Sequence, residues 1–488
     1  MGRKYLVGLC LLSVACSLFA ATQPETKTLD SVQLVSWLIG SIPSERVAHS
    51  VQQRGITSAM DPSCSKALES SGATPDLLEK IRSASPQYEA AKVMLCPAEL
   101  AVAGELAVQH RFHEAELLLR KLVNSRPENG ALHFALGNLL RQQEKWNDAF
   151  DEFSESARLT PGFADAHTRL SSLFYRAEDP DNTIAEARTA LSIEPGNAEG
   201  YKLLGLGFFA NGQYGAAMNA FRESLAHQPD NPEIYYDMGM ALREQGDLHA
   251  AEASYRRAVQ LKPGYWEAHT NLGLVLHEQH KLDQAIAEYK EAKRLAPEQP
   301  AVRNNLGSTY CEKGTYDAAI TEFRELFQMN PGWQSGHSCM AKAYMAKHDY
   351  EAAIAELRLS VQQNPTGAAE HRVLGQALLL TGKDRDALRE LEIAVSLNPE
   401  SAAAHHYLGT ALNGLRDYDA AVKQFQEAVR LEPTADNHYY LAASLINQGS
   451  YDAALIELET AARIDPEKPI YRARQDELLK LMRNGDAR

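Results

Sequence analysis

The chain has 488 residues, of which 44% are hydrophobic and 23% are charged, and this ordinary globular composition excludes a wholly disordered chain. Its 49 Lys and Arg residues against 64 Asp and Glu residues give a formal net charge of −15. That sign argues against nucleic acid and anionic lipid as partners, since both are bound mainly through cationic side chains.

The first residues predict an export signal. Residues 1–4 include Arg3 and Lys4, an apolar run extends from Tyr5 to Phe19, and small residues follow at 20–22. The run is too short for a comfortable membrane span, and no later stretch approaches about 20 apolar residues. We therefore expect residues 1–20 to be a signal peptide, and the mature chain to be periplasmic or secreted, with no membrane span.

A lipid anchor at Cys16 is the alternative reading of this segment. Residues 13–16, Ser-Val-Ala-Cys, resemble a bacterial lipobox, in which the cysteine would be acylated and become the new N-terminus. That motif usually has Leu three residues before the cysteine, and Ser13 stands there instead. We therefore favour cleavage after Ala20 or Ala21.

Residues 21–95 are expected to form a polar leader and a small helical module. Four short helices are predicted over residues 30–85, with starts at Pro43, Asp61-Pro62 and Thr74-Pro75. We expect the module to pack near the start of the following region, although a separate domain on a flexible joint near residue 85 would also fit the sequence. It carries no catalytic pattern.

Four cysteines lie beyond the export signal, namely Cys64, Cys96, Cys311 and Cys339. This is too sparse for a disulfide scaffold. Export would permit a disulfide, and Cys64 with Cys96 is the preferred pair because both flank one short region. The alternative is that all four are small buried hydrophobic residues.

A period of 34 residues dominates the rest of the chain. Ten prolines recur at this interval, and an eleventh, Pro466, follows after 33 residues. Twelve residues before each proline stands an alanine, except at Thr183 in the third unit. The prolines in strict register are Pro127, Pro161, Pro195, Pro229, Pro263, Pro297, Pro331, Pro365, Pro399 and Pro433.

Each period is predicted to be a pair of amphipathic helices. Apolar residues recur at helical spacing, as at Leu272, Val275 and Leu276. A Leu-Gly pair in the first helix, such as Leu272-Gly273, would let two backbones approach, and a bulky residue such as Tyr289 would fill the space beside it. The proline ends the second helix.

This pattern resembles the tetratricopeptide repeat family over residues 96–468, which would hold eleven repeats. The resemblance implies an all-α fold, a right-handed superhelix of stacked helical hairpins. It also implies that the first helix of each hairpin lines a concave groove and that the second faces outward. Residues 469–488 are expected to form a capping helix and a short tail, because a solenoid needs a polar end.

The groove is the expected binding surface, since a solenoid binds along its concave face. Amides there would pair with peptide backbone and aromatic rings would pack on side chains. Asn271 and Asn305 occupy the same position in consecutive repeats. The groove candidates are Asn138, Arg141, Tyr175, Arg176, Tyr236, Arg243, Thr270, Asn271, His277, Asn304, Asn305, Lys342, Arg372, Gln376, His406 and Tyr439.

Catalytic and metal sites are not predicted. Histidines recur at one repeat position, for example His133 and His269, but stacked helices lie about 8–10 Å apart, too far for two imidazoles to share a zinc ion. The segment 277–280 has its histidines three residues apart rather than four, so it does not match HExxH. We expect no cofactor and no metal.

The sequence therefore predicts a non-catalytic scaffold of the cell envelope that binds a peptide or protein segment in its groove. The alternative is a structural subunit of an envelope assembly for secretion, pilus formation or polymer export, docking through convex faces and the N-terminal module. A cryptic enzyme or carbohydrate binder is a third hypothesis, which would need clustered carboxylates in a pocket.

Overall fold

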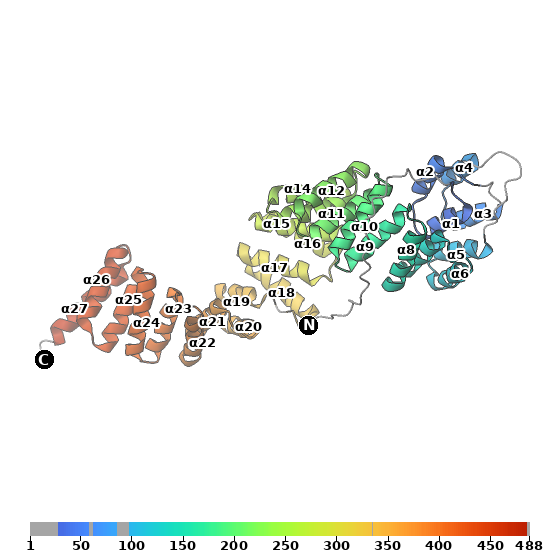
Figure 1. Cartoon of the computed structure of the whole chain (residues 1–488). Coiled ribbons are helices and arrows are strands. Elements are labelled where there is room, and N and C mark those ends of the chain that lie inside the picture. Colours follow the sequence, from blue (N-terminus) through green and yellow to red (C-terminus); the bar gives the residue numbers. More distant parts are fainter. Residues whose placement is uncertain (1–27, 58–61, 85–96, 334, 486–488) are drawn as a thin grey trace, which may run out of the picture. The chain divides into compact units, whose positions relative to one another are not determined.

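The computed structural model describes residues 28–57, 62–84, 97–333 and 335–485 (Figure 1). In these ranges the chain forms 27 α-helices and one isolated bridge, between Leu29 and Ile56. It divides into two compact units, unit 1 over Met1–Gln245 and unit 2 over Gly246–Arg488. None of the described helices combines the length and the apolar character needed to cross a membrane.

Unit 1 holds the N-terminal module, four hairpins and the first helix of a fifth. The expected four-helix module is confirmed as α1 to α4, and α5 to α13 follow the 34-residue period. The helices are α1 (Ser31–Ile39), α2 (Ser44–Arg54), α3 (Pro62–Ser70), α4 (Pro75–Ala84), α5 (Ala98–Val108), α6 (Phe112–Ser125), α7 (Gly130–Gln142), α8 (Trp146–Leu159), α9 (Ala164–Arg176), α10 (Pro180–Ile193), α11 (Ala198–Ala210), α12 (Tyr214–His227) and α13 (Pro232–Glu244).

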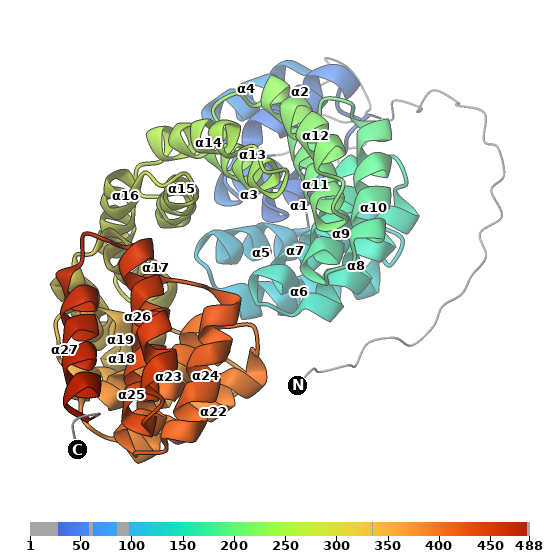
Figure 2. The same cartoon turned by 90° about the vertical axis from the view of Figure 1, so that its left-hand side faces the viewer.

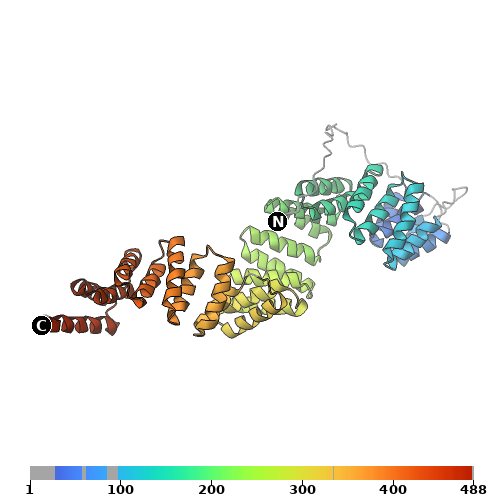
Figure 3. The ribbon, with the colours of Figure 1, turned by 90° about the horizontal axis from the view of Figure 1, so that it is seen from below.

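Unit 2 continues the period and ends in one unpaired helix (Figure 3). The helices are α14 (Leu248–Leu261), α15 (Trp266–Glu278), α16 (Leu282–Leu295), α17 (Pro300–Lys313), α18 (Tyr316–Met329), α19 (His337–Ala346), α20 (Tyr350–Gln363), α21 (Ala368–Leu380), α22 (Asp384–Leu397), α23 (Ala402–Gly414), α24 (Tyr418–Leu431), α25 (Ala435–Gln448), α26 (Tyr451–Ile464) and α27 (Pro469–Gly485). The last, α27, covers the final hairpin and buries Tyr471 and Leu478 (1% and 2% exposed).

A glycine against a ring sets the spacing inside each hairpin. At Gly205, on α11, an added Cβ would lie 2.5 Å from Phe221 Cε1 on α12. At Gly273, on α15, it would lie 2.7 Å from Tyr289 Cε1 on α16. Both rings are buried, so they have no room to retreat. The predicted role of the Leu-Gly pair and the bulky residue is confirmed.

The third repeat departs from the pattern at Thr183, and the neighbouring helix compensates. The Thr183 hydroxyl is buried and donates to Asp179 O at 2.7 Å. On the adjoining α11, a Cβ at Gly207 would come within 3.2 Å of Thr183 Cγ2 and 2.8 Å of Ile184 Cγ1. Gly207, the second glycine of the segment Gly205-Leu206-Gly207, therefore makes space for these larger side chains.

The N-terminal module is closed by its own polar contacts. Asp30 caps α1, accepting from Gln33 N at 2.7 Å, while Gln33 Oε1 accepts from Asp30 N at 2.9 Å. Leu29 N donates to Gly55 O at 3.0 Å and Thr57 N donates to Leu29 O at 2.9 Å, which joins the two ends of the first hairpin. These contacts lie within the module and involve no residue of the repeats.

Candidate binding surface

The N-terminal module lies on the first helices of the opening repeats (Figure 2). Helix α1 packs against α5 and α7, and α3 packs against α5. The Trp37 indole stacks on the Phe163 ring, with centroids 5.2 Å apart and planes 6° apart. Gly40 faces Phe134 so closely that an added Cβ would lie 2.2 Å from its ring. The module thus occupies the face on which this repeat pattern is expected to bind its partners.

Arg46, on α2, ties the module to the third repeat. Its Nη1 and Nη2 donate to the two carboxylate oxygens of Asp165 at 2.8 and 3.3 Å, and Nη2 also donates to Glu194 Oε2 at 2.6 Å. Burial lowers the pKa of Arg46, but the two carboxylates outweigh it and the net shift is upward. The ion pair therefore holds the guanidinium charged at the junction.

Asn138 is not exposed in a groove, which corrects the expectation from the sequence. It is fully buried, because the module covers it. Its Nδ2 donates to Ile39 O at 3.3 Å and to Ser41 Oγ at 2.9 Å. The partner of this side chain is therefore a segment of the same chain.

Arg141 bonds to the same asparagine, and Arg169 lies on α9, the first helix of the next repeat. Arg141 Nε and Nη2 donate to Asn138 Oδ1 at 3.3 and 3.1 Å. Burial lowers the pKa of Arg141, and the charge of Arg169 lowers it further. Arg169 Nε is buried and has no hydrogen-bond partner among the described residues.

Further along unit 1, Asp237 places a buried carboxyl group on α13. Its side chain is buried beside Lys202, whose Nζ pairs with Glu199 at 2.8 Å. Burial raises the pKa of Asp237 to about 7, against the opposing effect of Lys202. Tyr175 is 37% exposed and lies near Asp237, since the carboxyl group adds to burial in raising the pKa of the Tyr175 hydroxyl.

The other predicted groove residues of unit 1 differ in their surroundings. The Arg176 guanidinium lies 3.8 Å from the centre of the Trp146 ring, so this side chain packs along the neighbouring hairpin. On α13, Tyr236 and Arg243 are half-buried, and Arg243 Nη1 lies 3.5 Å from Glu244 Oε1. The structure therefore brings Arg141 to the module through Asn138, but leaves Arg176 away from this contact.

In unit 2 the predicted groove residues are spread over successive first helices. Thr270 Oγ1 donates to Trp266 O at 2.8 Å, and Asn304 Oδ1 accepts from Ser335 Oγ at 3.3 Å. Half-buried positions are Asn271, Asn305 and Gln376, and Lys342 is exposed. The two consecutive asparagines lie on α15 and α17 as predicted, with no third asparagine at Cys339.

Aromatic rings gather on α23 and α25. His406 lies edge-on to the Tyr440 ring with centroids 4.7 Å apart, and its Nδ1 is 2.8 Å from Asn437 Oδ1. Tyr439 packs beside Tyr440 at 5.5 Å. Burial raises the pKa of Tyr407, which the nearby charge of Arg372 opposes. This part of unit 2 offers rings and one guanidinium to a ligand.

The recurrent histidines bind within their own repeats. His133 Nδ1 lies 2.6 Å from Glu152 Oε2 and its Nε2 lies 2.9 Å from Pro127 O. The same Nδ1-to-acceptor contact, nineteen residues along the chain, recurs at six other repeats, whose pairs are His167 with Glu186, His269 with Glu288, His337 with Glu356, His371 with Glu390, His405 with Gln424 and His438 with Glu457. These histidines therefore link the first helix of each of these repeats to the second. The Nε2 atoms of His133, His269, His371 and His405 also lie close to the proline carbonyl in the turn before the first helix.

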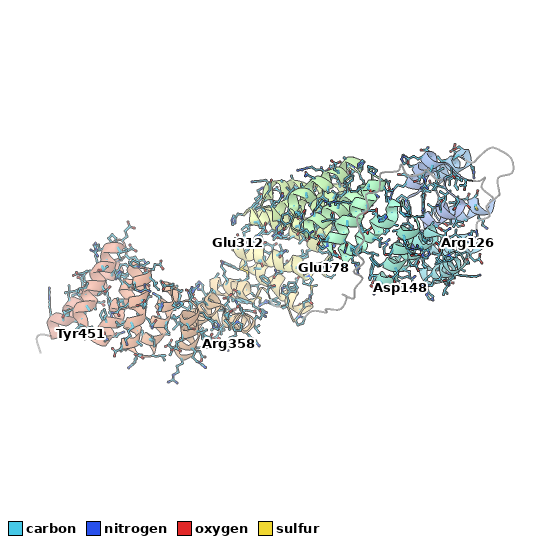
Figure 4. All side chains as sticks on the ribbon, in the orientation of Figure 1. Arg126, Asp148, Glu178, Glu312, Arg358 and Tyr451 are labelled. Atoms are coloured by element: carbon cyan, nitrogen blue, oxygen red, sulfur yellow. A yellow bond between two sulfur atoms is a disulfide. The ribbon has the colours of Figure 1, made fainter. Side chains whose placement is uncertain are left out.

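The second histidine segment pairs with the next repeat. Glu312, labelled in Figure 4, lies 2.8 Å from His277 Nε2 and 3.5 Å from His280 Nδ1. Across the part of the chain that the structure describes, no three His, Cys, Asp or Glu side chains are placed to hold a metal ion. The contact connects α15 to α17.

The sequence did not predict the disulfide between Cys311 and Cys339. These residues join α17 to α19, with Cα atoms 6.4 Å apart and a sequence separation of 28. Cys64 is buried and disulfide-bonded, but Cys96 lies outside the described residues, so that pairing stays a prediction. Sequence reasoning also missed Trp37, Arg46 and Arg169. Arg169 stands at the helix position that Asn271 and Asn305 occupy in later repeats. A charged residue at that position is the sequence signal that could have identified it.

Comparisons with known proteins agree with this architecture. The tetratricopeptide repeat model matches residues 103–164, 202–265, 236–300, 270–332, 373–434 and 408–469, more than half of the chain. No curated protein matches the chain.

Solved structures of repeat proteins also match, at low identity. A tetratricopeptide repeat protein from Parabacteroides merdae is 19% identical, with a TM-score of 0.37, over 51% of this chain and 98% of that one. Pseudomonas aeruginosa pilF is 20% identical, with a TM-score of 0.39, over 44% and 97%. Yeast Tom70 is 13% identical, with a TM-score of 0.32, over 78% and 95%.

Proposed function

Because the chain belongs to the tetratricopeptide repeat family, we propose that it is an exported, non-catalytic scaffold of the cell envelope. It binds a peptide or protein segment along the first helices of its repeats. The observation that carries this proposal is the docked N-terminal module. Trp37 stacks on the Phe163 ring, and the Asn138 amide donates to the backbone carbonyl of Ile39. Aromatic stacking and amide-to-backbone hydrogen bonds are the interactions by which such a surface recognises polypeptide.

Two features support the exported location. Residues 1–22 have the charged start, apolar run and small-residue exit of a secretory signal. The disulfide between Cys311 and Cys339 is typical of an oxidising compartment. Intact-mass spectrometry of the exported protein distinguishes cleavage near Ala21 from an acylated Cys16, which would make the protein lipid-anchored instead.

The docked position of the N-terminal module favours groove binding over the alternative in which the protein joins an assembly through this module. Trp37 and Arg46, its large aromatic and its paired cation, are already engaged with the repeats. A docking arm would present such side chains to a partner. If the protein is instead a subunit of an envelope assembly, it would bind the other subunits through its convex faces.

Crosslinking in the native compartment, followed by mass spectrometry, tests the proposal. We expect captured proteins to be lost when Tyr236, Arg243, Asn271 and Asn305 are all changed to alanine. The matched control is Arg358→Ala on α20, an exposed residue on a second helix, labelled in Figure 4. Capture that survives the groove variant but not the control would refute groove binding and support the convex-face alternative.

A further inference from the structure

The final helix, α27, packs on α26 through one side (Figure 1). Tyr471 and Leu478 are buried there, and Gln475 Nε2 donates to Glu459 Oε1 on α26 at 3.3 Å. These three residues of α27 are three or four positions apart, so they share one face of the helix. Most of the other described side chains of α27 are exposed.

Four of these other side chains form a stripe along α27. They are separated by four, three and four residues, which is the spacing of side chains that meet a second helix in a coiled coil. The α27 stripe consists of Ile470, Arg474, Glu477 and Leu481. Ile470 is 51% exposed and Leu481 is 48% exposed, so the structure leaves apolar surface at both ends of the stripe.

These apolar ends depart from the repeat pattern. Ile470 stands four residues after the repeat proline Pro466, and Leu481 stands fifteen residues after it. In α13 and α15 the same two places hold glutamates, namely Glu233, Glu244, Glu267 and Glu278. A helix that only shields the last hairpin from water would need polar side chains at both places. The α27 stripe therefore has a property that capping does not explain.

The charged centre of the α27 stripe is complementary to itself in one orientation. Arg474 Nη1 lies 2.9 Å from Glu477 Oε2 on the same helix, and the two side chains are 39% and 65% exposed, so this pair alone contributes little stability. When two α27 helices meet antiparallel about a twofold axis between residues 475 and 476, Arg474 of each copy faces Glu477 of the other. Ile470 then faces Leu481 of the second copy. A parallel pair would instead place Arg474 against Arg474 and Glu477 against Glu477.

We propose that the α27 stripe is a self-association surface, on which a second copy of this chain packs its own α27 antiparallel. Apolar contacts form at both ends, and opposite charges meet across the centre, where they set the register and the orientation. A twofold contact uses the same patch on both copies, so it closes at a dimer. The dimer goes beyond the proposed function, because it needs no other partner and uses none of the groove candidates. One helix pair is a small interface, and we expect a dissociation constant on the order of 0.1 mM.

Sedimentation equilibrium of the full chain, at protein concentrations from about 10 to 300 µM, tests the surface. We expect the average mass of the wild type to rise with concentration from the monomer value toward twice that value. Arg474→Glu and Glu477→Arg each place like charges opposite each other, so each variant alone should associate at least about tenfold more weakly. An equimolar mixture of the two variants should recover dimers, because each variant then offers the charge that the other needs.

Arg472→Glu is the matched control, because it makes the same charge change on α27 at an exposed place outside the stripe. It should associate as the wild type does, and circular dichroism should give all variants the helix content of the wild type. A wild type that stays monomeric at every concentration overturns the proposal, as does a dimer that survives both charge reversals. Equal weakening by Arg472→Glu, or a mixture of the two stripe variants that does not recover dimers, also overturns it.

Discussion

His133 is bound by two acceptors at once, the carboxylate of Glu152 at 2.6 Å from Nδ1 and the carbonyl of Pro127 at 2.9 Å from Nε2. A neutral imidazole has one N–H group and can satisfy only one of them, whereas the protonated ring satisfies both. Burial lowers the pKa of His133, but these two contacts outweigh burial and the net shift is upward. His269 has the same surroundings, with Glu288 and Pro263.

The first prediction is that these pairs make the protein more stable in mild acid. Because the folded pKa of His133 and His269 is raised, their contribution is fully present below the unfolded pKa and is lost as pH rises through the folded one. We expect each pair to contribute about 0.5–1.5 kcal/mol to the free energy of unfolding at pH 6 relative to pH 8, measured by urea denaturation at both pH values.

Glu152→Gln and Glu288→Gln are the matched variants, because the chain already uses a glutamine at this place. His405 Nδ1 lies 2.7 Å from Gln424 Oε1, and an amide can turn either its oxygen or its nitrogen toward the ring. The two variants should flatten the difference between pH 6 and pH 8. If the difference stays the same in both, the histidines are not its source.

The second prediction concerns Asp237, whose pKa burial raises to about 7 from an ordinary 3.8. The folded state then holds a proton that the unfolded state has lost, so the free energy of unfolding falls as pH rises between these two values. Asp237→Asn should stabilise the protein at pH 7.5 by a few kcal/mol at most. Asparagine already stands at the equivalent position in the next two repeats, as Asn271 and Asn305.

The measurement for Asp237→Asn is the free energy of unfolding at pH 5 and pH 7.5. The variant should gain at pH 7.5 and gain less at pH 5. Asp151→Asn, at an exposed position on α8, is the control and should change little at either pH. A loss of stability at pH 7.5 in Asp237→Asn would mean that the charged carboxylate is favourably bound.

The third prediction is that Trp37→Ala releases the N-terminal module. Trp37 is 5% exposed and stacked on Phe163, so its truncation should cost roughly 3–5 kcal/mol. We expect amide hydrogen exchange over residues 29–57 to rise while exchange in α21 to α24 is unchanged. Glu69→Ala, at an exposed position on α3, should leave the exchange of the module as it is. Slow exchange of the module in Trp37→Ala would contradict the proposed docking.

The hairpins were predictable and the docking of the module was not, for a physical reason. The contact between Gly273 and Tyr289 lies within one period, and the sequence repeats the glycine at this position in seven repeats. Asn138 meets Ile39 across 99 residues, and neither residue belongs to a repeated pattern that points to the other. Only the helix positions of the groove residues could be inferred, and not which of them the module would cover.

The fourth prediction is that the bond between Cys311 and Cys339 stabilises unit 2. Its closure of a 28-residue segment is expected to contribute about 2–4 kcal/mol to the free energy of unfolding. Changing both cysteines to alanine should lower stability without reductant. Reductant should lower the stability of both proteins through the loss of the Cys64 disulfide, which both share. The wild type should also lose the bond between Cys311 and Cys339, so the two proteins should be equally stable with reductant present.

The thiol state checks this directly. Without reductant, an alkylating reagent under denaturing conditions should leave Cys311 and Cys339 unmodified, as seen by peptide mass spectrometry. Full alkylation of both residues in freshly isolated protein would show that the bond does not form.

The long-range ion pair between Arg46 and Glu194 affects how the N-terminal part of the chain must fold. A repeat protein usually folds by adding one neighbour to the next, so a shortened chain keeps most of what remains. Here Arg46 closes a loop of 148 residues to Glu194, and Trp37 reaches Phe163. The first helices can therefore complete these contacts only when the first three repeats are present. Serial truncation from the C-terminus should remove stability in small steps down to the fourth repeat, and then in one large step.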